Sequence, residues 1–227
     1  GNAAYKKAAE YARLAINAHG GAVLSENEWT NTSTAFNTPA SSWMWGLQHS
    51  VDTVINNLFQ FTAHMAIEAS YGYAPLSQPG VSSSDYKRLS DTDFRKKLMK
   101  GPETTYAEFA PYTSMTADEL NALAPYVFFK FRPANGNRTE YKAAGAVALP
   151  LMRCEEMYFI EMEAVYHTAG VAAAVPLLDQ FMATRTSNYQ IKTQDYLDEI
   201  IFQKGIEFWG EGLIMFDMKR LDMGIDT

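Results

Sequence analysis

The stretch EFWGEGLIMFDMKR, residues 207–220, concentrates acidic residues, two glycines, one tryptophan and a basic pair within a short segment. It follows an apolar-periodic segment at about 194–209, for which we predict a helix with Thr193 as its N-cap. Glycine adopts positive φ angles at no steric cost, so Gly210 and Gly212 predict a sharp turn at the end of that helix. We therefore expect a structural corner here, rather than a catalytic loop or a ligand site.

The side chains of this corner are expected to contact one another. Phe216 is predicted to dock back onto the apolar end of the helix. A glycine inside a helix costs about 1 kcal/mol relative to alanine, so Gly205 suggests close packing against a neighbouring helix. Glu207 and Glu211 are expected to form ion pairs among the charged residues that follow them, which are Asp217, Lys219 and Arg220.

Hydrophobic periodicity predicts three further helices. The first covers residues 2–19, and its apolar stripe consists of Ala4, Ala8, Tyr11, Ala12 and Ala15. Residues 151–169 and 172–185 form the other two, and Gly170 separates them, which gives a helical hairpin. Small residues on the apolar stripe and a short connection are typical of tetratricopeptide units, although only this hairpin and the first helix have the pattern.

The region between the first helix and the hairpin is rich in Asn, Ser, Thr, Gly and Pro, which favour loops. We predict long loops with a few short elements: an extended piece at 41–47, a weak helix at 51–69, a short helix at 90–100 that begins at Ser90 or Asp91, and a strand at 126–133. The predicted fold class is mainly α, with tetratricopeptide-like helical hairpins, long irregular loops and little β structure.

Several aromatic residues lie within these polar loops. Flat rings stack on the apolar faces of sugars, and neighbouring amide and hydroxyl side chains supply hydrogen bonds. An extended piece at 41–47 would place Trp43 and Trp45 on one face. The alternative is that the rings cover the core beneath the loops. The candidate ligand-binding residues are Trp43, Trp45, Tyr71, Tyr73 and Tyr86.

Composition and motifs exclude several classes of function. The formal net charge is −7 at pH 7 and no cluster of Lys and Arg is present, which argues against nucleic acid as a partner. The single cysteine, Cys154, excludes an intramolecular disulfide. There is no apolar run of about eighteen residues, so no membrane-spanning helix is predicted. The sequence has no nucleophile elbow and no phosphate loop, and we expect no catalytic residues and no cofactor.

A metal site is not predicted either. Glu156 and Glu163 project from one helix face, but di-iron bundles need a Glu-x-x-His pair on each of two helices. Here Glu163 and His167 are four positions apart, and the pattern is not repeated. We expect the two glutamates to pair with Arg153 and Arg185 instead. No acidic loop has the ligand spacing of a calcium site.

Two C-terminal motifs carry a resemblance to a known family. The first is PLMRCEEMYFIEMEAVYHTAG at 150–170, and its matching residues are Arg153, Glu156, Tyr158, Ile160, Glu163 and Ala164. The second is EIIFQKGIEFWGEGLIMFDMKR at 199–220, and its matching residues are Glu207, Glu211, Gly212, Phe216, Asp217 and Arg220. Together they resemble the structural motifs of the SusD/RagB family of outer-membrane nutrient-binding lipoproteins.

This resemblance implies a single SusD-like domain over residues 1–227, with a helical repeat element at 1–24, a loop-rich, ligand-facing region at 25–150, and a C-terminal hairpin and corner at 151–227. It implies a fragment without the family's N-terminal part, which carries a lipidated cysteine, and without its C-terminal tail. The implied function is non-enzymatic: capture of a glycan or oligosaccharide on the external face of an outer membrane, and delivery to a TonB-dependent, SusC-like transporter.

A second hypothesis is a tetratricopeptide-like protein-interaction scaffold without direct sugar binding. Helical hairpins form concave surfaces that hold peptides or proteins. In that case the loop aromatics belong to the core and its cover. Protection of all four tryptophans from acrylamide quenching would favour the scaffold over an open sugar platform.

Overall fold

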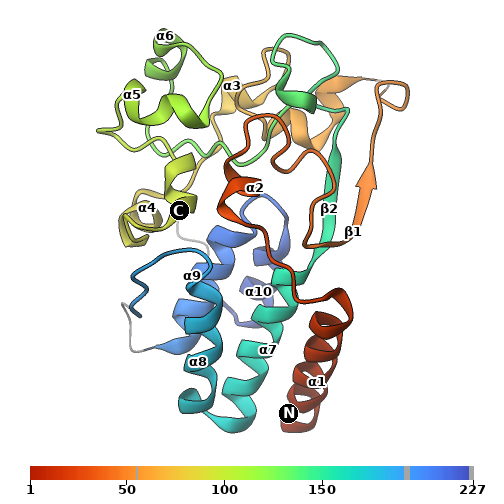
Figure 1. Cartoon of the computed structure of the whole chain (residues 1–227), viewed down its shortest axis with the longest axis vertical. Helices are drawn as coiled ribbons and strands as arrows, with labels where there is room; N and C mark the ends of the chain where they lie inside the picture. The colour runs from red at the N-terminus through yellow and green to blue at the C-terminus, as the bar shows by residue number, and fades with distance from the viewer. Residues whose placement is uncertain (55, 192–194, 225–227) are drawn as a thin grey trace. The chain divides into compact units, whose positions relative to one another are not determined.

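The computed structural model describes residues 1–54, 56–191 and 195–224. This described part consists mainly of helices and short helical turns joined by long loops, with one two-stranded sheet (Figure 1). The predicted class, mainly α with long irregular loops and little β structure, is confirmed. The chain divides into two compact units. We call residues 1–22, 153–184 and 188–227 unit 1, and residues 23–152 and 185–187 unit 2.

Unit 1 is built from the longer helices. They are α1 (Asn2–His19), α7 (Cys154–Ala169), α8 (Val171–Met182), α9 (Tyr196–Glu207) and α10 (Leu213–Arg220). Figure 1 shows α1, α7 and α8 side by side, with α7 in the middle. Gly170, with φ of 84°, separates α7 from α8. The predicted first helix and helical hairpin are therefore confirmed.

The buried face of α1 differs from the predicted stripe. Ala12 and Ile16 are buried, whereas Tyr11 is 63% exposed. Arg13 forms an ion pair with Glu161 of α7, with 2.8 Å between Arg13 Nε and Glu161 Oε1. Residues two apart lie about 200° apart around a helix. The ion pair therefore turns Arg13 towards α7 and leaves Tyr11 in solvent.

Asp195 is the N-cap of helix α9, and its carboxylate accepts hydrogen bonds from the backbone N–H groups of Leu197 and Asp198. The predicted cap, Thr193, lies outside the described residues. Gly205 lies inside this helix, but the predicted tight packing is wrong. A Cβ atom at Gly205 would meet only Ile214 Cδ1, at 3.9 Å, which is an ordinary van der Waals distance.

The backbone of the predicted corner is confirmed. Gly210 and Gly212 have φ angles of 75° and 81°, and they turn the chain after α9. The chain then forms helix α10, which we did not predict. Phe216 does not dock back and is 69% exposed. Helix α10 buries Asp217, and an adjacent residue points about 100° away around the helix, so Phe216 faces solvent.

The ion pairs around the corner differ from the predicted ones. Glu207 and Glu211 pair with Arg153, at the end of β2. Glu163 pairs with Arg220 rather than with Arg153 or Arg185; Arg220 Nη2 lies 2.5 Å from Glu163 Oε2. Asp217 pairs with Lys204 and Arg220. The predicted partners are wrong because Glu163, Glu207 and Glu211 each meet a cation from another element of unit 1, not the nearest one in sequence.

Unit 2 contains short elements joined by loops. They are α2 (Glu26–Thr30), β1 (Trp43–Gln48), η1 (Asn57–Phe59), η2 (Phe61–His64), α3 (Ala74–Ser77), α4 (Ser83–Arg88), η3 (Phe94–Leu98), α5 (Tyr106–Phe109), η4 (Ala110–Tyr112), α6 (Ala117–Asn121), η5 (Ala134–Gly136) and β2 (Ala148–Arg153). Capping boxes start three of these helices, at the pairs Ser25–Glu28, Thr105–Glu108 and Thr116–Glu119. Such boxes satisfy N–H groups that a short helix leaves without partners.

An aromatic core holds unit 2 together. The Trp29 ring is fully buried and meets the Phe36 ring edge-on, with 4.8 Å between their centroids. Lys130 is buried in the same core, and its ammonium lies 4.6 Å from the Phe36 ring centroid and 5.2 Å from that of Trp29. Ring faces carry negative potential, so these contacts stabilise the buried cation.

Three predicted elements of unit 2 are corrected by the structure. The described residues of the predicted helix at 51–69 contain two 3-10 turns, η1 and η2, rather than a helix. The segment 90–100 forms η3, which Asp93 caps instead of Ser90 or Asp91. The segment 126–133 makes only isolated bridges, at Val127 and Phe128, and is not a strand. The extended piece at 41–47 is confirmed as β1, which pairs with β2.

Candidate functional site

Exposed aromatic rings gather on the loops of unit 2. Tyr71 and Tyr141 are 50% and 45% exposed, and their rings meet at 67° with 5.8 Å between centroids. Tyr73 is 40% exposed, and its ring lies 4.9 Å from that of His64. Phe61, in η2, is also exposed. We call these residues, Phe61, His64, Tyr71, Tyr73 and Tyr141, the aromatic cluster.

A close approach between two backbones holds Tyr71 and Tyr73 beside η2. The Tyr73 N–H donates to the carbonyl of Ala63, with 2.8 Å between nitrogen and oxygen. A Cβ atom on Gly72 would lie 2.5 Å from the same carbonyl oxygen, closer than any side chain tolerates. Glycine between the two tyrosines is therefore required for this turn to pack against η2.

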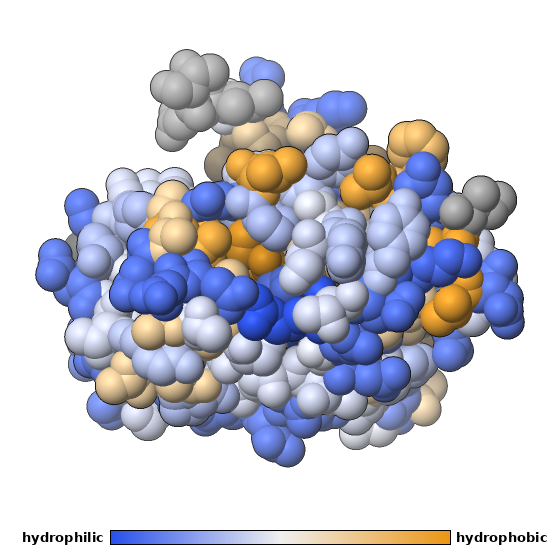
Figure 2. Space-filling view, turned by 90° about the horizontal axis from the view of Figure 1, so that it is seen from above, coloured by the Kyte–Doolittle hydropathy of each residue, from blue (hydrophilic) through white to orange (hydrophobic). Residues whose placement is uncertain are grey.

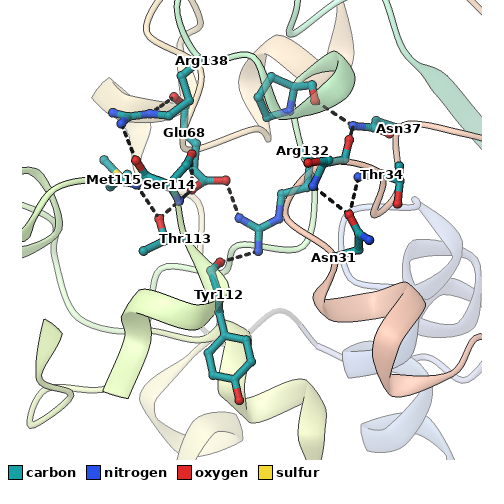
Figure 3. Close-up of polar contacts among 12 residues, drawn as sticks. Asn31, Thr34, Asn37, Glu68, Tyr112, Thr113, Ser114, Met115, Arg132 and Arg138 are labelled. Atoms are coloured by element: carbon teal, nitrogen blue, oxygen red, sulfur yellow. Dashed lines mark hydrogen bonds and ion pairs between the residues drawn. The ribbon is translucent and has the colours of Figure 1, made fainter. Parts of the chain in front are cut away.

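A polar network around Glu68 and Arg138 joins several loops of unit 2 (Figure 3). Glu68 accepts hydrogen bonds from the Thr113 hydroxyl at 2.6 Å and the Ser114 N–H at 2.7 Å, and it pairs with buried Arg132. Arg138 reaches three acceptors: the Glu68 carbonyl at 3.2 Å, the Ser114 carbonyl at 2.8 Å and the Glu119 carboxylate at 2.6 Å. The network therefore fixes the loops that carry the exposed rings.

The charges of this network are balanced. Burial by itself would raise the pKa of Glu68, but Arg132, the Thr113 hydroxyl and the Ser114 N–H outweigh it and hold this pKa below its ordinary value. Arg138, together with the Thr116 N–H, lowers the pKa of Glu119 to about 2. Both carboxylates are therefore ionised at neutral pH, and each faces an arginine.

The predicted ligand residues do not all meet. Tyr71 and Tyr73 lie in the aromatic cluster, as described above. Trp45 is 62% exposed on β1, whereas Trp43 is half-buried and its ring lies 3.1 Å from the position of a Cβ atom on Gly46. The indole nitrogen of Trp43 is buried without a hydrogen-bond partner among the described residues. Trp45 is therefore the more accessible ring of this pair.

Tyr86 lies in a separate hollow of unit 2, with a volume of about 560 Å³. The ammonium of Lys96 lies 4.6 Å from the centroid of the Tyr86 ring, and the ring of Tyr126 lies 5.3 Å away. A Cβ atom on Gly101 would lie 2.2 Å from the Tyr86 hydroxyl oxygen. Protein groups thus surround this ring on several sides, which leaves it less open for stacking than Tyr71.

Sequence reasoning missed Tyr141 and Phe61. Tyr141 follows the segment Asn135–Gly136–Asn137, where Asn135 and Gly136 have positive φ angles and the Asn137 side chain accepts from the N–H of Thr139 at 3.1 Å. Such Asn-Gly signals mark a surface turn, so an aromatic residue beside them could have been ranked as a loop aromatic. Nothing local indicated that this loop lies against Tyr71.

The surface around the loops is mixed in polarity. Figure 2 shows one face of the molecule, on which hydrophobic residues form several separate groups among hydrophilic ones instead of a continuous patch. Within the described ranges, no group of three or more His, Cys, Asp and Glu side chains has the arrangement of a metal site. No helix in the described part combines the length and hydrophobicity that crossing a membrane requires.

Solved structures share this fold. A SusD-like carbohydrate binding protein from Bacteroides vulgatus aligns with a TM-score of 0.68 and 21% identity, over 96% of this chain and 41% of its own. Surface glycan-binding protein A from Bacteroides thetaiotaomicron aligns with a TM-score of 0.63 and 15% identity, over 98% of this chain and 51% of its own. The same protein in complex with laminarihexaose aligns with a TM-score of 0.52 and 16% identity, over 81% of this chain and 43% of its own.

The chain thus spans about half, or less, of the length of these relatives. At such identities the likeness shows a shared fold. A search of curated proteins finds no match. The model of the SusD family matches residues 25–225, which is most of the chain, and the chain therefore belongs to the SusD family.

Proposed function

We propose that this protein captures a glycan or oligosaccharide, and that the aromatic cluster of unit 2 contacts it. The observation that carries this proposal is the pair of half-exposed rings, Tyr71 and Tyr141, which meet at an angle on loops of different parts of the chain. A buried packing role would remove these rings from water. Here about half of each side chain stays accessible to a ligand.

The chemistry of the cluster suits a sugar. A sugar ring presents an apolar face of C–H groups and a polar rim of hydroxyl groups, and binding sites match such ligands with aromatic rings and a few placed polar groups. The tyrosines combine a flat apolar face with a hydroxyl group. The separate hydrophobic groups in Figure 2 are also more suited to an amphipathic ligand than to a continuous apolar interface.

The role that we propose for the cluster is binding without catalysis. The two carboxylates of the polar network are held in place by hydrogen bonds. Arg132, Thr113 and Ser114 hold Glu68, and Arg138 holds Glu119. A general acid needs a raised pKa, but the pKa values of Glu68 and Glu119 are both lowered. Such groups support a structure and do not supply protons to a reaction.

Membership of the SusD family supports the wider part of the proposal. We propose that the protein acts on the external face of an outer membrane, is lipid-anchored in its full-length form, and delivers its ligand to a TonB-dependent, SusC-like transporter. Co-purification with such a transporter from membranes tests the partnership. Recovery of the protein in the outer-membrane fraction, with protease accessibility on whole cells, tests the location.

A glycan array tests the binding itself, with the whole protein, its Tyr71→Ala variant and a Tyr11→Ala control. Tyr11 is exposed on α1 and lies outside the cluster, so its loss should leave binding unchanged. We expect the wild-type protein to bind one or more glycans, and the Tyr71→Ala variant to lose most of that signal while its circular dichroism stays normal. Equal signals from all three proteins would move the site away from the cluster.

The protein-interaction scaffold is the second candidate. It is favoured by the exposure of Tyr11 and Leu14 on α1, at 63% and 54%. Exposed apolar side chains on one helix can take part in a protein interface. A wild-type protein that binds no glycan on the array, yet co-purifies with the transporter, would favour the scaffold over glycan capture.

A further inference from the structure

The rings of Tyr71 and Tyr141 form an open corner rather than a packed stack. Their planes meet at 67° with 5.8 Å between centroids, and each side chain stays about half exposed. The Tyr141 hydroxyl has no hydrogen-bond partner within the described residues. One sugar ring can lie flat on one tyrosine and place its edge against the other, with the Tyr141 hydroxyl available to a sugar hydroxyl group.

Arg138 joins the two segments that carry these rings. Its carbonyl accepts from the Ser70 N–H at 2.9 Å, next to Tyr71, and its guanidinium donates to the Glu68 carbonyl at 3.2 Å. The same guanidinium is tied to the Ser114 carbonyl and to Glu119. Figure 3 shows the contacts of the Arg138 guanidinium with this network. Because Arg138 is three positions before Tyr141, its bonds to Ser70 and Glu68 fix the loop of one ring to the turn of the other.

The two cations that flank Tyr141 in the sequence, Arg138 and Lys142, are already bound to protein acceptors. Arg138 uses both Nη atoms and Nε, as described above, and the Lys142 ammonium donates to the Val51 carbonyl at 2.9 Å. Glu140 precedes Tyr141 in the chain and is exposed. A uronate or sulfate group would therefore find a guanidinium that is occupied by other partners, on a segment that also carries an exposed carboxylate.

We infer that Tyr71 and Tyr141 form one subsite for a single uncharged sugar ring, and that Arg138 is a positioning residue that sets the angle between the two rings. This inference rests on the proposed function of glycan binding. It extends the proposed function in two ways: it states that the bound sugar is uncharged, and it names the residue that fixes the geometry of the subsite. Arg138 acts through the rings and does not recognise a negative charge on the ligand.

The first test compares neutral oligosaccharides with uronate-containing and sulfated ones on the glycan array. We expect the binders to be uncharged, with an affinity that changes less than about twofold when salt is raised from low to physiological concentration. Preferential binding of anionic glycans, weakened by salt, would overturn the inference but leave glycan capture intact. Absence of any glycan binding would overturn the proposed function, and this inference with it.

The second test is a double-mutant cycle with a neutral oligosaccharide that binds on the array. Tyr141→Ala should weaken binding about tenfold or more, and Tyr141→Phe should weaken it less, because the ring remains. Arg138→Met should weaken binding in the wild-type background but have little further effect in the Tyr141→Ala background. A general structural role would weaken binding equally in both backgrounds, and that result would contradict the positioning role.

A separate measurement keeps this test independent of folding. Thermal unfolding of each variant, followed by circular dichroism, must show one cooperative transition well above the binding temperature. If Arg138→Met fails this criterion, Glu119→Gln replaces it, because this change weakens one arm of the Arg138 network at an exposed position. An unchanged affinity in a folded Glu119→Gln variant, together with an unchanged affinity in Tyr141→Ala, would overturn the proposed subsite.

Discussion

Arg153 and Glu211 form a bidentate ion pair across 58 positions of sequence: Arg153 Nε and Nη2 each lie 2.9 Å from a Glu211 carboxylate oxygen. The guanidinium is fully buried and also meets Glu155 at 3.0 Å and Glu207 at 3.3 Å. Burial would lower the pKa of Arg153, but the three carboxylates outweigh burial and raise it. Within unit 1, one cation thus joins the start of α7 to the end of α9 and the corner.

Replacement of this cation should be costly. Arg153→Met leaves three buried or nearly buried carboxylates without their shared partner, so we expect a loss of about 3–5 kcal/mol in the free energy of unfolding. Urea denaturation measures it. Arg13→Met is the control, because the side chain of Arg13 is 41% exposed in its pair with Glu161, and we expect a loss of at most about 1 kcal/mol. Equal losses in the two variants would contradict a special role for Arg153.

Substitution by alanine should change the stability of the protein in opposite directions at two glycines. At Gly205, inside α9, a Cβ atom would make only an ordinary van der Waals contact with Ile214, so Gly205→Ala should raise the free energy of unfolding by up to about 1 kcal/mol. Gly72 lies against the Ala63 carbonyl, so Gly72→Ala should lower stability by about 1–3 kcal/mol. Chemical denaturation of both variants checks the pair. A destabilised Gly205→Ala variant would indicate packing that the structure does not show.

Glu68 should make stability depend on pH. Its pKa is lower in the folded protein than the ordinary value of 4.5, so the unfolded chain takes up its proton first as the pH falls. The contribution of Glu68 is therefore complete above about pH 4.5 and is lost as the pH falls through the folded pKa. Urea denaturation from about pH 7 to about pH 3 should show that the stability difference between wild type and Glu68→Gln shrinks in acid.

Glu156 provides a control of opposite sign. Burial raises the pKa of Glu156, and Lys204 only partly offsets this effect, so the charged carboxylate is unfavourable in the folded state. Glu156→Gln should therefore stabilise the protein at neutral pH, and this gain should disappear as the pH falls below the unfolded pKa of 4.5. A destabilised Glu156→Gln variant at neutral pH would show that its interaction with Lys204 outweighs burial.

The tryptophans should differ in their accessibility to acrylamide. Trp45 is 62% exposed and Trp29 is fully buried. We expect Trp45→Phe to remove most of the quenchable fluorescence and to leave the unfolding transition unchanged. Trp29→Phe should leave the quenchable component in place but destabilise the protein, because a smaller ring in place of the fully buried indole leaves a cavity in the core. Protection of all four tryptophans in the wild-type protein would contradict the exposure of Trp45.

The long helices could be predicted from the sequence, but the short elements could not. A period of 3.6 residues over many positions identified α1, α7 and α8, and the glycine pair identified the corner. The segments 51–69 and 126–133 were misassigned because their apolar residues serve the core of unit 2. Their backbone then follows tertiary packing rather than a local pattern. Capping boxes such as Thr116–Glu119 were readable signals that were not used.

Part of the candidate site could likewise be predicted from the sequence, and part could not. Exposure of Tyr71 and Tyr73 follows from their Gly- and Ser-rich surroundings, which mark loops. The partnership of Tyr71 with Tyr141 joins segments 70 positions apart, so no local pattern contains it. The choice of Arg138 as the link between these segments depends on three acceptors from other loops.

By itself, the sequence determined the long helices, the corner at Gly210 and Gly212, and the motifs that belong to the SusD family. These features depend on local periodicity and on backbone freedom, which neighbouring residues carry. Only the tertiary structure decided that Arg153 binds Glu211, that Phe216 faces solvent and that Tyr71 meets Tyr141. Those outcomes depend on which distant groups the folded chain brings within a few ångströms of one another. The free energy of such a contact depends on both segments together, so neither segment alone predicts it.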